Sequence, residues 1–306
     1  MAKGRNGNGH VAMLSASPHG RRQMPDSLQA LLLGIIEGIT EFLPISSTGH
    51  LLIAEHWLGH RSDLFNIAIQ AGAILAVVFI YWRKLCSLAL AFLGRRDVSD
   101  VDTGQPLSVG EARAYVLKLL AAFAVTAVGG LLVKKLGWQL PETVRPVAWA
   151  LILGAAWMVI AEQLAAKRAE AIGERTTVSW TTAVLVGIAQ IVAGVFPGTS
   201  RSSATIFIAL LGGTTSRAAA TEFAFLVGIP TMFAATGYEL LKVRHQSAGE
   251  DWNALLVGFV VSGVVAFIAV KWLLRYVQTH RFTVFAWYRI ALGAALLAGV
   301  MSGALQ

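Results

Sequence analysis

Residues 31–53 read LLLGIIEGITEFLPISSTGHLLI, an apolar run interrupted by two glutamates, a proline and a group of hydroxyl side chains. Pro44 removes a backbone donor and disfavours helix at the residue before it, so we predict a helix over about 28–43. A second short helix follows over about 50–58. Neither helix reaches the roughly 20 apolar residues that cross a bilayer. The stretch therefore predicts a re-entrant helix-loop-helix unit, with its broken backbone buried in protein or lining a wet cavity.

The stretch has a counterpart in the second half of the chain, VLVGIAQIVAGVFPGTSRSSATI at 184–206. The alignment pairs Gly34 with Gly187, Glu37 with Gln190, Pro44 with Pro197, and Ser47 with Ser200. Each half, about 27–165 and 180–306, then holds one such unit followed by three apolar spans. Because the re-entrant unit does not cross the membrane, each half crosses it an odd number of times. The two halves are therefore predicted to be inverted relative to each other, with the two loops meeting near the middle of the membrane.

The composition is that of a membrane protein. Of 306 residues, 56% are hydrophobic and 14% charged, and the mean hydropathy is +0.63, outside the usual range for soluble domains. Apolar windows of spanning length lie at 64–82, 116–133, 147–161, 223–241, 254–270 and 284–300. We predict an all-α integral membrane fold with six transmembrane helices and two re-entrant units, in one domain over 27–306. Residues 1–26 are predicted to be a disordered tail, and polar loops are expected at 94–113, 162–179 and 242–253.

The net charge of +8 does not indicate nucleic acid, because the basic residues lie in short joints between apolar runs. That pattern is typical of anchors to lipid headgroups. The single cysteine, Cys86, excludes an internal disulfide and a cysteine metal cluster. The expected partner is the bilayer, and the sequence leaves a homodimer open.

Glu37 and Glu41 are four residues apart and so share one face of the first short helix. Ionisable groups in an apolar segment are costly and indicate a functional site. Two like charges there require that one carboxyl is protonated or that a cation lies between them. Oxygen ligands favour Mg²⁺ or Ca²⁺ over Zn²⁺. The alternative is that the pair is solvated among headgroups.

The first loop places hydroxyls at Ser46, Ser47 and Thr48 beside the imidazole of His50. A nucleophile needs a base within reach, and this loop supplies both beside Glu41. Alternatively, the hydroxyls cap a helix that begins near Thr48. The two interpretations are compatible, because a helix N-terminus is itself an anion site.

The second loop places Arg201 between apolar helices, where a guanidinium needs an anionic partner. Its planar fork suits phosphate oxygens, and Gly198 permits close backbone approach. The alternative is a permanent ion pair with Glu37 or Glu41. Hydroxyls surround the arginine at Thr199, Ser200, Ser202, Ser203 and Thr205.

Other polar residues carry weaker expectations. His56 and His60 have metal-binding spacing, but their flanks favour an interfacial helix end. Four further residues are candidates to face the cavity behind the site: Asp63, Asn66, Gln70 and Glu222.

EGITE followed by FLPISSTGH, together with FPGTSRSSATI, closely resembles the two signatures of the bacitracin-resistance family of undecaprenyl-diphosphate phosphatases, [E/Q]xxxE and PGxSRSxxT. The resemblance extends from about residue 27 to the C-terminus. The chain departs from the pattern at Ser203, where many members have glycine. The family implies a bacterial plasma-membrane enzyme that removes the terminal phosphate of undecaprenyl diphosphate, so that the lipid again carries cell-wall precursors.

Together, the residues and the resemblance give a specific expected site. The expected catalytic residues are Glu37, Glu41, Ser47, His50 and Arg201, with Glu37 and Glu41 also the ligands of the divalent ion. The expected substrate-binding residues are Ser46, Thr48, Gly198, Thr199, Ser200, Ser202, Ser203 and Thr205. Ser47 is the preferred nucleophile, with Glu41 or His50 accepting its proton. A histidine nucleophile and a metal-activated water stay open.

Two further expectations concern location and the competing class of function. The Arg- and Lys-rich loops favour a site open to the outer face of the membrane, although the basic N-terminal tail argues against it. Because inverted repeats with broken helices also occur in secondary transporters, a carrier of polyprenyl phosphate or a small anion is the alternative.

Overall fold

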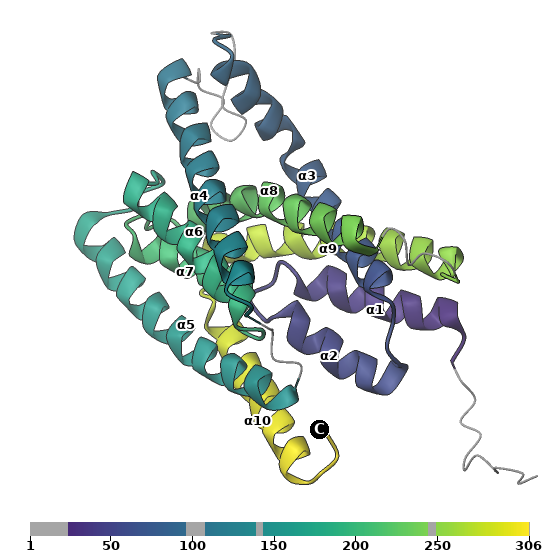
Figure 1. The fold of residues 1–306 in the computed structure, drawn as a ribbon. Coiled ribbons are helices and arrows are strands. Elements are labelled where there is room, and N and C mark those ends of the chain that lie inside the picture. Colours follow the sequence, from purple (N-terminus) through teal and green to yellow (C-terminus); the bar gives the residue numbers. More distant parts are fainter. Residues whose placement is uncertain (1–23, 96–107, 139–142, 244–248, 306) are drawn as a thin grey trace, which may run out of the picture.

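The computed structural model describes residues 24–95, 108–138, 143–243 and 249–305, and within them the regular structure is entirely helical. The helices are α1 (Asp26–Thr40), α2 (Ser47–Leu58), α3 (Asp63–Phe92), α4 (Val109–Lys135), α5 (Val144–Ile172), α6 (Trp180–Val195), α7 (Arg201–Leu211), α8 (Arg217–Val243), α9 (Trp252–Thr279) and α10 (Thr283–Met301). The tail predicted over 1–26 lies outside these residues, apart from its last three. Figure 1 shows the helices in one bundle.

Six of these helices, α3, α4, α5, α8, α9 and α10, are long and apolar enough to cross a membrane, as predicted. They run beyond the apolar windows, because a helix continues through its charged ends until a capping residue stops it. α5 continues to Ile172 and ends at Gly173, which has φ 77°. The polar loop predicted over 162–179 was therefore wrong in extent, and only 173–179 connects α5 to α6. α4 likewise begins at Val109, inside the predicted loop 94–113.

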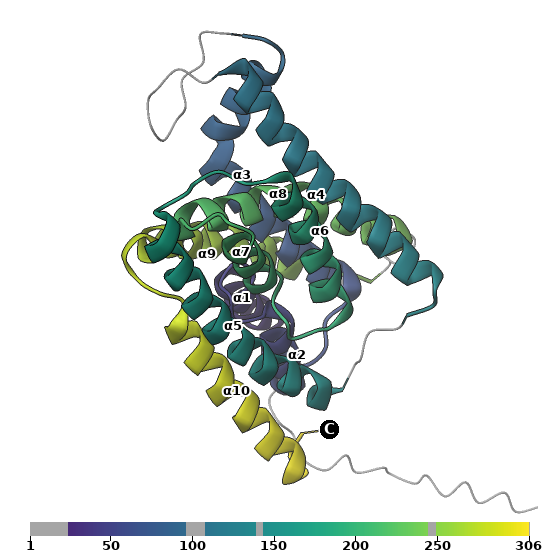
Figure 2. The ribbon, with the colours of Figure 1, turned by 90° about the vertical axis from the view of Figure 1, so that its left-hand side faces the viewer.

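Four helices are too short to span, with 15 residues in α1, 12 in α2, 16 in α6 and 11 in α7. They form the two helix-loop-helix units, α1–α2 and α6–α7. The packing repeats when equivalent helices of the two halves are exchanged, α1 with α6, α3 with α8 and α4 with α9. α1 and α3 both pack on α9, and their equivalents α6 and α8 both pack on α4. α3 also packs on α8, and α5 on α10 (Figures 1 and 2).

Glycines at equivalent positions let each first short helix approach its neighbour. A Cβ on Gly34 of α1 would lie 2.7 Å from the carbonyl oxygen of Gly258 in α9. A Cβ on Gly187 of α6 would lie 2.6 Å from that of Ala122 in α4. Close backbone contact through small residues is a common mode of helix association in membranes. The aligned glycines therefore set the position of both units.

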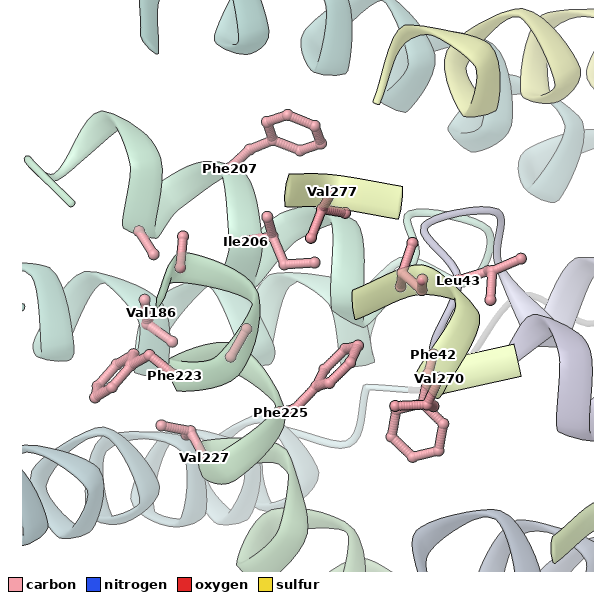
Figure 3. Close-up of a cluster of buried hydrophobic side chains, with 14 of the residues drawn as sticks. Phe42, Leu43, Val186, Ile206, Phe207, Phe223, Phe225, Val227, Val270 and Val277 are labelled. Carbon is pink, nitrogen blue, oxygen red and sulfur yellow. The ribbon is translucent and has the colours of Figure 1, made fainter. Parts of the chain in front are cut away.

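The first loop is fixed in the core by its own apolar side chains. Phe42 and Leu43 are only 5% and 8% exposed. The Phe42 ring packs edge-on against Phe225 of α8, with ring centroids 5.4 Å apart, and Val270 of α9 belongs to the same buried cluster (Figure 3). The loop is thus held between α8 and α9, and its polar residues are left to face the second loop.

Candidate active site

Both loops end in a serine that caps the following helix in an unusual conformation. Ser46 has φ 74° and Ser200 has φ 68°, in the left-handed region that serine seldom adopts. The Oγ of Ser46 accepts from the backbone N–H of Gly49 at 3.4 Å, and that of Ser200 from the N–H of Ser203 at 3.3 Å. The same strained cap therefore begins α2 and α7.

These caps correct the predicted alignment of the repeats by one residue. Between proline and cap the first loop has only Ile45, whereas the second has Gly198 and Thr199. Ser46 is consequently the counterpart of Ser200, and Ser47 is the counterpart of Arg201. Ser47 and Arg201 are the first residues of α2 and α7.

Both of these first helical residues bind the same carboxylate. Nη2 of Arg201 donates to Oε1 of Glu41 at 2.8 Å, and Oγ of Ser47 donates to Oε2. The Glu41 side chain is 4% exposed and that of Arg201 is 29% exposed, so the carboxylate is buried while the guanidinium is partly accessible. The structure thus contains the Arg201–Glu41 ion pair that the sequence left open as an alternative. The carboxylate therefore holds the Ser47 hydroxyl beside the Arg201 guanidinium.

Glu37 lies one turn before Glu41 in α1 and is only 2% exposed, which excludes a pair solvated among headgroups. Its Oε2 is buried and has no hydrogen-bond partner among the described residues. A buried carboxylate oxygen without a donor is costly, and a cation would satisfy it. The described residues contain no group of three or more His, Cys, Asp or Glu with metal-site geometry. Two carboxylates still fit Mg²⁺, because Mg²⁺ commonly takes its other ligands from water and substrate phosphates.

Both ring nitrogens of His50 have partners other than Ser47. Nδ1 lies 2.7 Å from the carbonyl oxygen of Ser46, and Nε2 lies 2.6 Å from the hydroxyl of Tyr288 in α10. The rings of His50 and Tyr288 are also parallel, with centroids 5.6 Å apart. The imidazole is therefore held beside the first loop rather than against the hydroxyl of Ser47. Tyr288 was not predicted as part of the site.

The hydroxyls that follow Arg201 mostly bind the protein backbone. Ser202 donates to the carbonyl of Leu43 at 3.0 Å and so joins the second loop to the first. Thr205 donates to the carbonyl of Arg201 at 2.8 Å, within α7. Through these contacts, the two side chains help to position Arg201.

Arg289 of α10 was not predicted, yet it contacts both loops. The residue is fully buried. Its guanidinium donates to the carbonyl oxygens of Pro44 (3.4 Å), Thr199 (3.0 Å), Gly198 (3.0 Å), Ala150 (3.2 Å) and Leu151 (3.3 Å). Pro44 belongs to the first loop, Thr199 and Gly198 belong to the second loop, and Ala150 and Leu151 belong to α5. The sequence did contain a signal for this residue, because Arg289 lies inside the predicted span 284–300. A charged side chain within an apolar span is costly and indicates a special role, as was argued for Arg201.

A cavity of about 410 Å³ lies between the loops and α4, α6 and α8. The predicted residues that line it are Glu41, Ser46, Ser47, Thr48, Gly198, Ser200 and Arg201. The predicted residues outside the lining are Glu37, His50, Thr199, Ser202, Ser203 and Thr205, along with Asp63, Asn66, Gln70, Glu222, His56 and His60. Lys134 and Trp138, at the end of α4, line the cavity and were not predicted.

Comparison with known families places these loops in a recognised context. The profile of the family described as bacitracin resistance protein BacA matches residues 30–295. The chain belongs to the BacA family. The match includes both loops of this BacA chain and Arg289, which holds them together.

Curated relatives agree with the BacA assignment over nearly the whole chain. A Rhizobium etli protein named undecaprenyl-diphosphatase is 61% identical over 280 residues, which cover 91% of this chain and 98% of the relative. A Xanthomonas oryzae pv. oryzae protein of the same name is 56% identical over 276 residues, covering 90% and 97%. At this identity and coverage, the matched regions extend over nearly the full length of both relatives.

Proposed function

We propose that this protein hydrolyses undecaprenyl diphosphate to undecaprenyl phosphate and inorganic phosphate, which recycles the lipid carrier of cell-wall synthesis and gives resistance to bacitracin. Membership of the BacA family and the name of the close relatives support this activity. The observation that carries it is that Ser47 and Arg201, from the two halves of the chain, both bind the buried carboxylate of Glu41.

The geometry supports a two-step transfer. The terminal phosphate binds the guanidinium of Arg201, which then shares its charge with the phosphate instead of with Glu41 alone. Glu41 accepts the proton of Ser47, and the Ser47 oxygen attacks the terminal phosphorus. The bond from that phosphorus to the bridging oxygen breaks, and the lipid monophosphate leaves. Water then cleaves the phosphoserine, releases inorganic phosphate and restores the Ser47 hydroxyl.

Among the proton acceptors considered for Ser47, the contacts favour Glu41 over His50. Glu41 already accepts the hydrogen bond of Ser47. The nitrogens of His50 face the Ser46 carbonyl and Tyr288. We therefore assign His50 a positioning role on the first loop. A phosphoenzyme trapped on His50, or the absence of any phosphoenzyme, would overturn this order.

We also propose a divalent cofactor, Mg²⁺ or Ca²⁺, held by Glu37 and Glu41 together with substrate oxygens. The unpartnered Oε2 of Glu37 is the supporting observation. The ion would supply positive charge beside the transferred phosphate. Arg201 alone does not offset two carboxylates and a diphosphate, so an added cation balances the site.

The location that we propose is the bacterial inner membrane, with the cavity open to the outer face. The helix ends and turns on the side away from the cavity mouth carry basic residues at Arg95, Arg113, Arg168, Arg175, Arg275 and Arg281. Among the described residues, the helix ends and turns on the mouth side carry fewer basic residues, namely Arg61, Lys134, Lys135, Arg145 and Lys242. Cytoplasmic loops carry the excess of Lys and Arg, which puts the richer side inside the cell. A homodimer is a further proposal, which native mass spectrometry in detergent tests.

The test is phosphate release from a short-chain polyprenyl diphosphate by detergent-purified protein, with and without EDTA. We expect release by the wild type, and loss of at least a hundredfold in Glu41→Gln and Arg201→Ala. Loss of release with EDTA, restored by Mg²⁺ or Ca²⁺, supports the cofactor. Folded wild-type protein that releases no phosphate would refute the proposal and favour the carrier, for which lipid transport in vesicles is the assay.

A further inference from the structure

The cavity has a second cationic residue at its open end. Lys134 lies in the last turn of α4 and lines the cavity whose inner end holds Glu41 and Arg201. The lysine side chain is exposed, so a ligand reaches it without any rearrangement of the fold. Trp138, which follows α4, lines the same end of the cavity, and its Nε1 donates to the carbonyl oxygen of Val195 in α6 at 3.4 Å. α4 and α6 pack on each other (Figure 2), and residues of both helices line the cavity.

The charges of the cavity make this lysine significant. Arg201 is paired with Glu41 at 2.8 Å, so the charge of its guanidinium is already balanced by that carboxylate. A lipid diphosphate carries several negative charges, and burying them requires cationic partners. Lys134 is the other cation that lines the cavity, and no carboxylate of the described residues lies within ion-pair distance of it. Lys242 nearby differs, because it is paired with Glu239 at 2.7 Å.

Two contacts hold the ammonium group of Lys134 without neutralising it. It lies 3.7 Å from the ring centroid of Tyr238 in α8, a cation–π distance. It is also at the C-terminal end of a helix, where the helix dipole favours positive charge. Both contacts leave the charge free to meet an anion. Lys135, the next residue, is also exposed but does not line the cavity, so it serves as a matched control.

We propose that Lys134, held over Tyr238 at the mouth of the cavity, binds the phosphate that stays on the lipid while Arg201 binds the phosphate that is removed. The proposal rests on the proposed function and names the residue that recognises the rest of the headgroup. A diphosphate bound in this way lies with its terminal phosphate inward and its isoprenoid chain toward the membrane. Lys134 then acts on substrate binding and on product release, rather than on bond cleavage.

The kinetic test compares Lys134→Gln with Lys135→Gln and Lys134→Arg. For Lys134→Gln we expect KM for a polyprenyl diphosphate to rise about tenfold, with kcat changed less than twofold. The inhibition constant of the lipid monophosphate should rise by a similar factor, whereas that of inorganic phosphate should stay unchanged. Lys135→Gln should match the wild type, and Lys134→Arg should keep most of the affinity. An unchanged KM, or a fall in kcat alone, would overturn the proposal, and so would an equal rise for inorganic phosphate.

A binding measurement separates this inference from the hydrolytic activity. Farnesyl phosphate is titrated into the wild type and Lys134→Gln, with isothermal calorimetry as the readout. A Kd about tenfold weaker in the variant supports the role of Lys134 whether or not the wild type releases phosphate. Equal affinity in the two proteins contradicts it, even if hydrolysis by the wild type is established.

Discussion

The space occupied by the Arg289 guanidinium makes a specific prediction for Gly154→Ala. Gly154 lies in α5, where an added Cβ would be 2.2 Å from Nη2 and 3.1 Å from Cζ of Arg289. An ordinary contact needs about 3.4 Å, so Nη2 has to move by about 1 Å. That shift breaks its hydrogen bonds to the carbonyls of Ala150 and Gly198, 3.2 and 3.0 Å long. Because Arg289 is fully buried, water cannot replace them.

The expected cost follows from those two bonds. Hydrogen bonds to charged groups contribute about 1.5–3 kcal/mol each, and alanine in a helix recovers about 1 kcal/mol relative to glycine. A net loss of about 3 kcal/mol is therefore expected. If the cost appears as a displacement of the second loop in the folded protein, kcat/KM should fall about a hundredfold. If the cost appears as lower stability of the whole fold, the apparent Tm in detergent should fall instead.

Both readouts should be measured on the same preparations, phosphate release for kcat/KM and thermal unfolding for Tm. Gly228→Ala is the control, since Gly228 is a buried glycine of α8 whose added Cβ meets nothing within 4 Å. In an Arg289→Lys background, Gly154→Ala should cost clearly less, because the clashing guanidinium is gone. A Gly154→Ala protein that matches Gly228→Ala in both readouts would refute the assigned role of Arg289.

Three further predictions follow from other contacts of the site and the fold. Tyr288→Phe removes the 2.6 Å hydrogen bond to His50 and should lower kcat/KM about fivefold, or about 1 kcal/mol, in the phosphate-release assay; unchanged kinetics would contradict the positioning role. Ser200→Gly relieves the positive φ while losing the cap, so its apparent Tm should exceed that of Ser200→Ala, and the reverse order would count against strain at this cap. Glu162→Gln weakens the 2.7 Å pair with Arg217 away from the cavity, so it should cost about 2 kcal/mol of stability without changing KM, which a shifted KM would disprove.

The sequence was sufficient for the arrangement of the helices, because its signals there are local. Hydropathy windows located all six spans, and Pro44 and Pro197 marked the breaks in the two short units. The internal repeat then predicted that the two loops meet. Helix ends were less predictable. α5 continues to Ile172, well past its apolar window at 147–161, and stops only at Gly173.

The details of the site depended on backbone geometry that the sequence does not display. The counterpart of Ser47 is Arg201 rather than Ser200, because a serine adopts a positive φ at each cap and the second loop has one extra residue. Hydroxyl directions were also hidden, and Ser202 turned out to bind a backbone carbonyl. Arg289 could have been found, but the surrounding apolar window masked its charge.

The carboxylate of Glu41 is bound by equivalent positions of the two halves of the chain, and these positions carry different side chains. Ser47 and Arg201 occupy the same place in two copies of one structural unit, and both bind Glu41. Two identical units would present either two serine hydroxyls or two guanidinium groups to this carboxylate. Because the equivalent positions differ, a hydroxyl and a cation meet at one carboxylate instead. The chemistry proposed above depends on this difference between the two halves, because it assigns attack to one position and phosphate binding to the other.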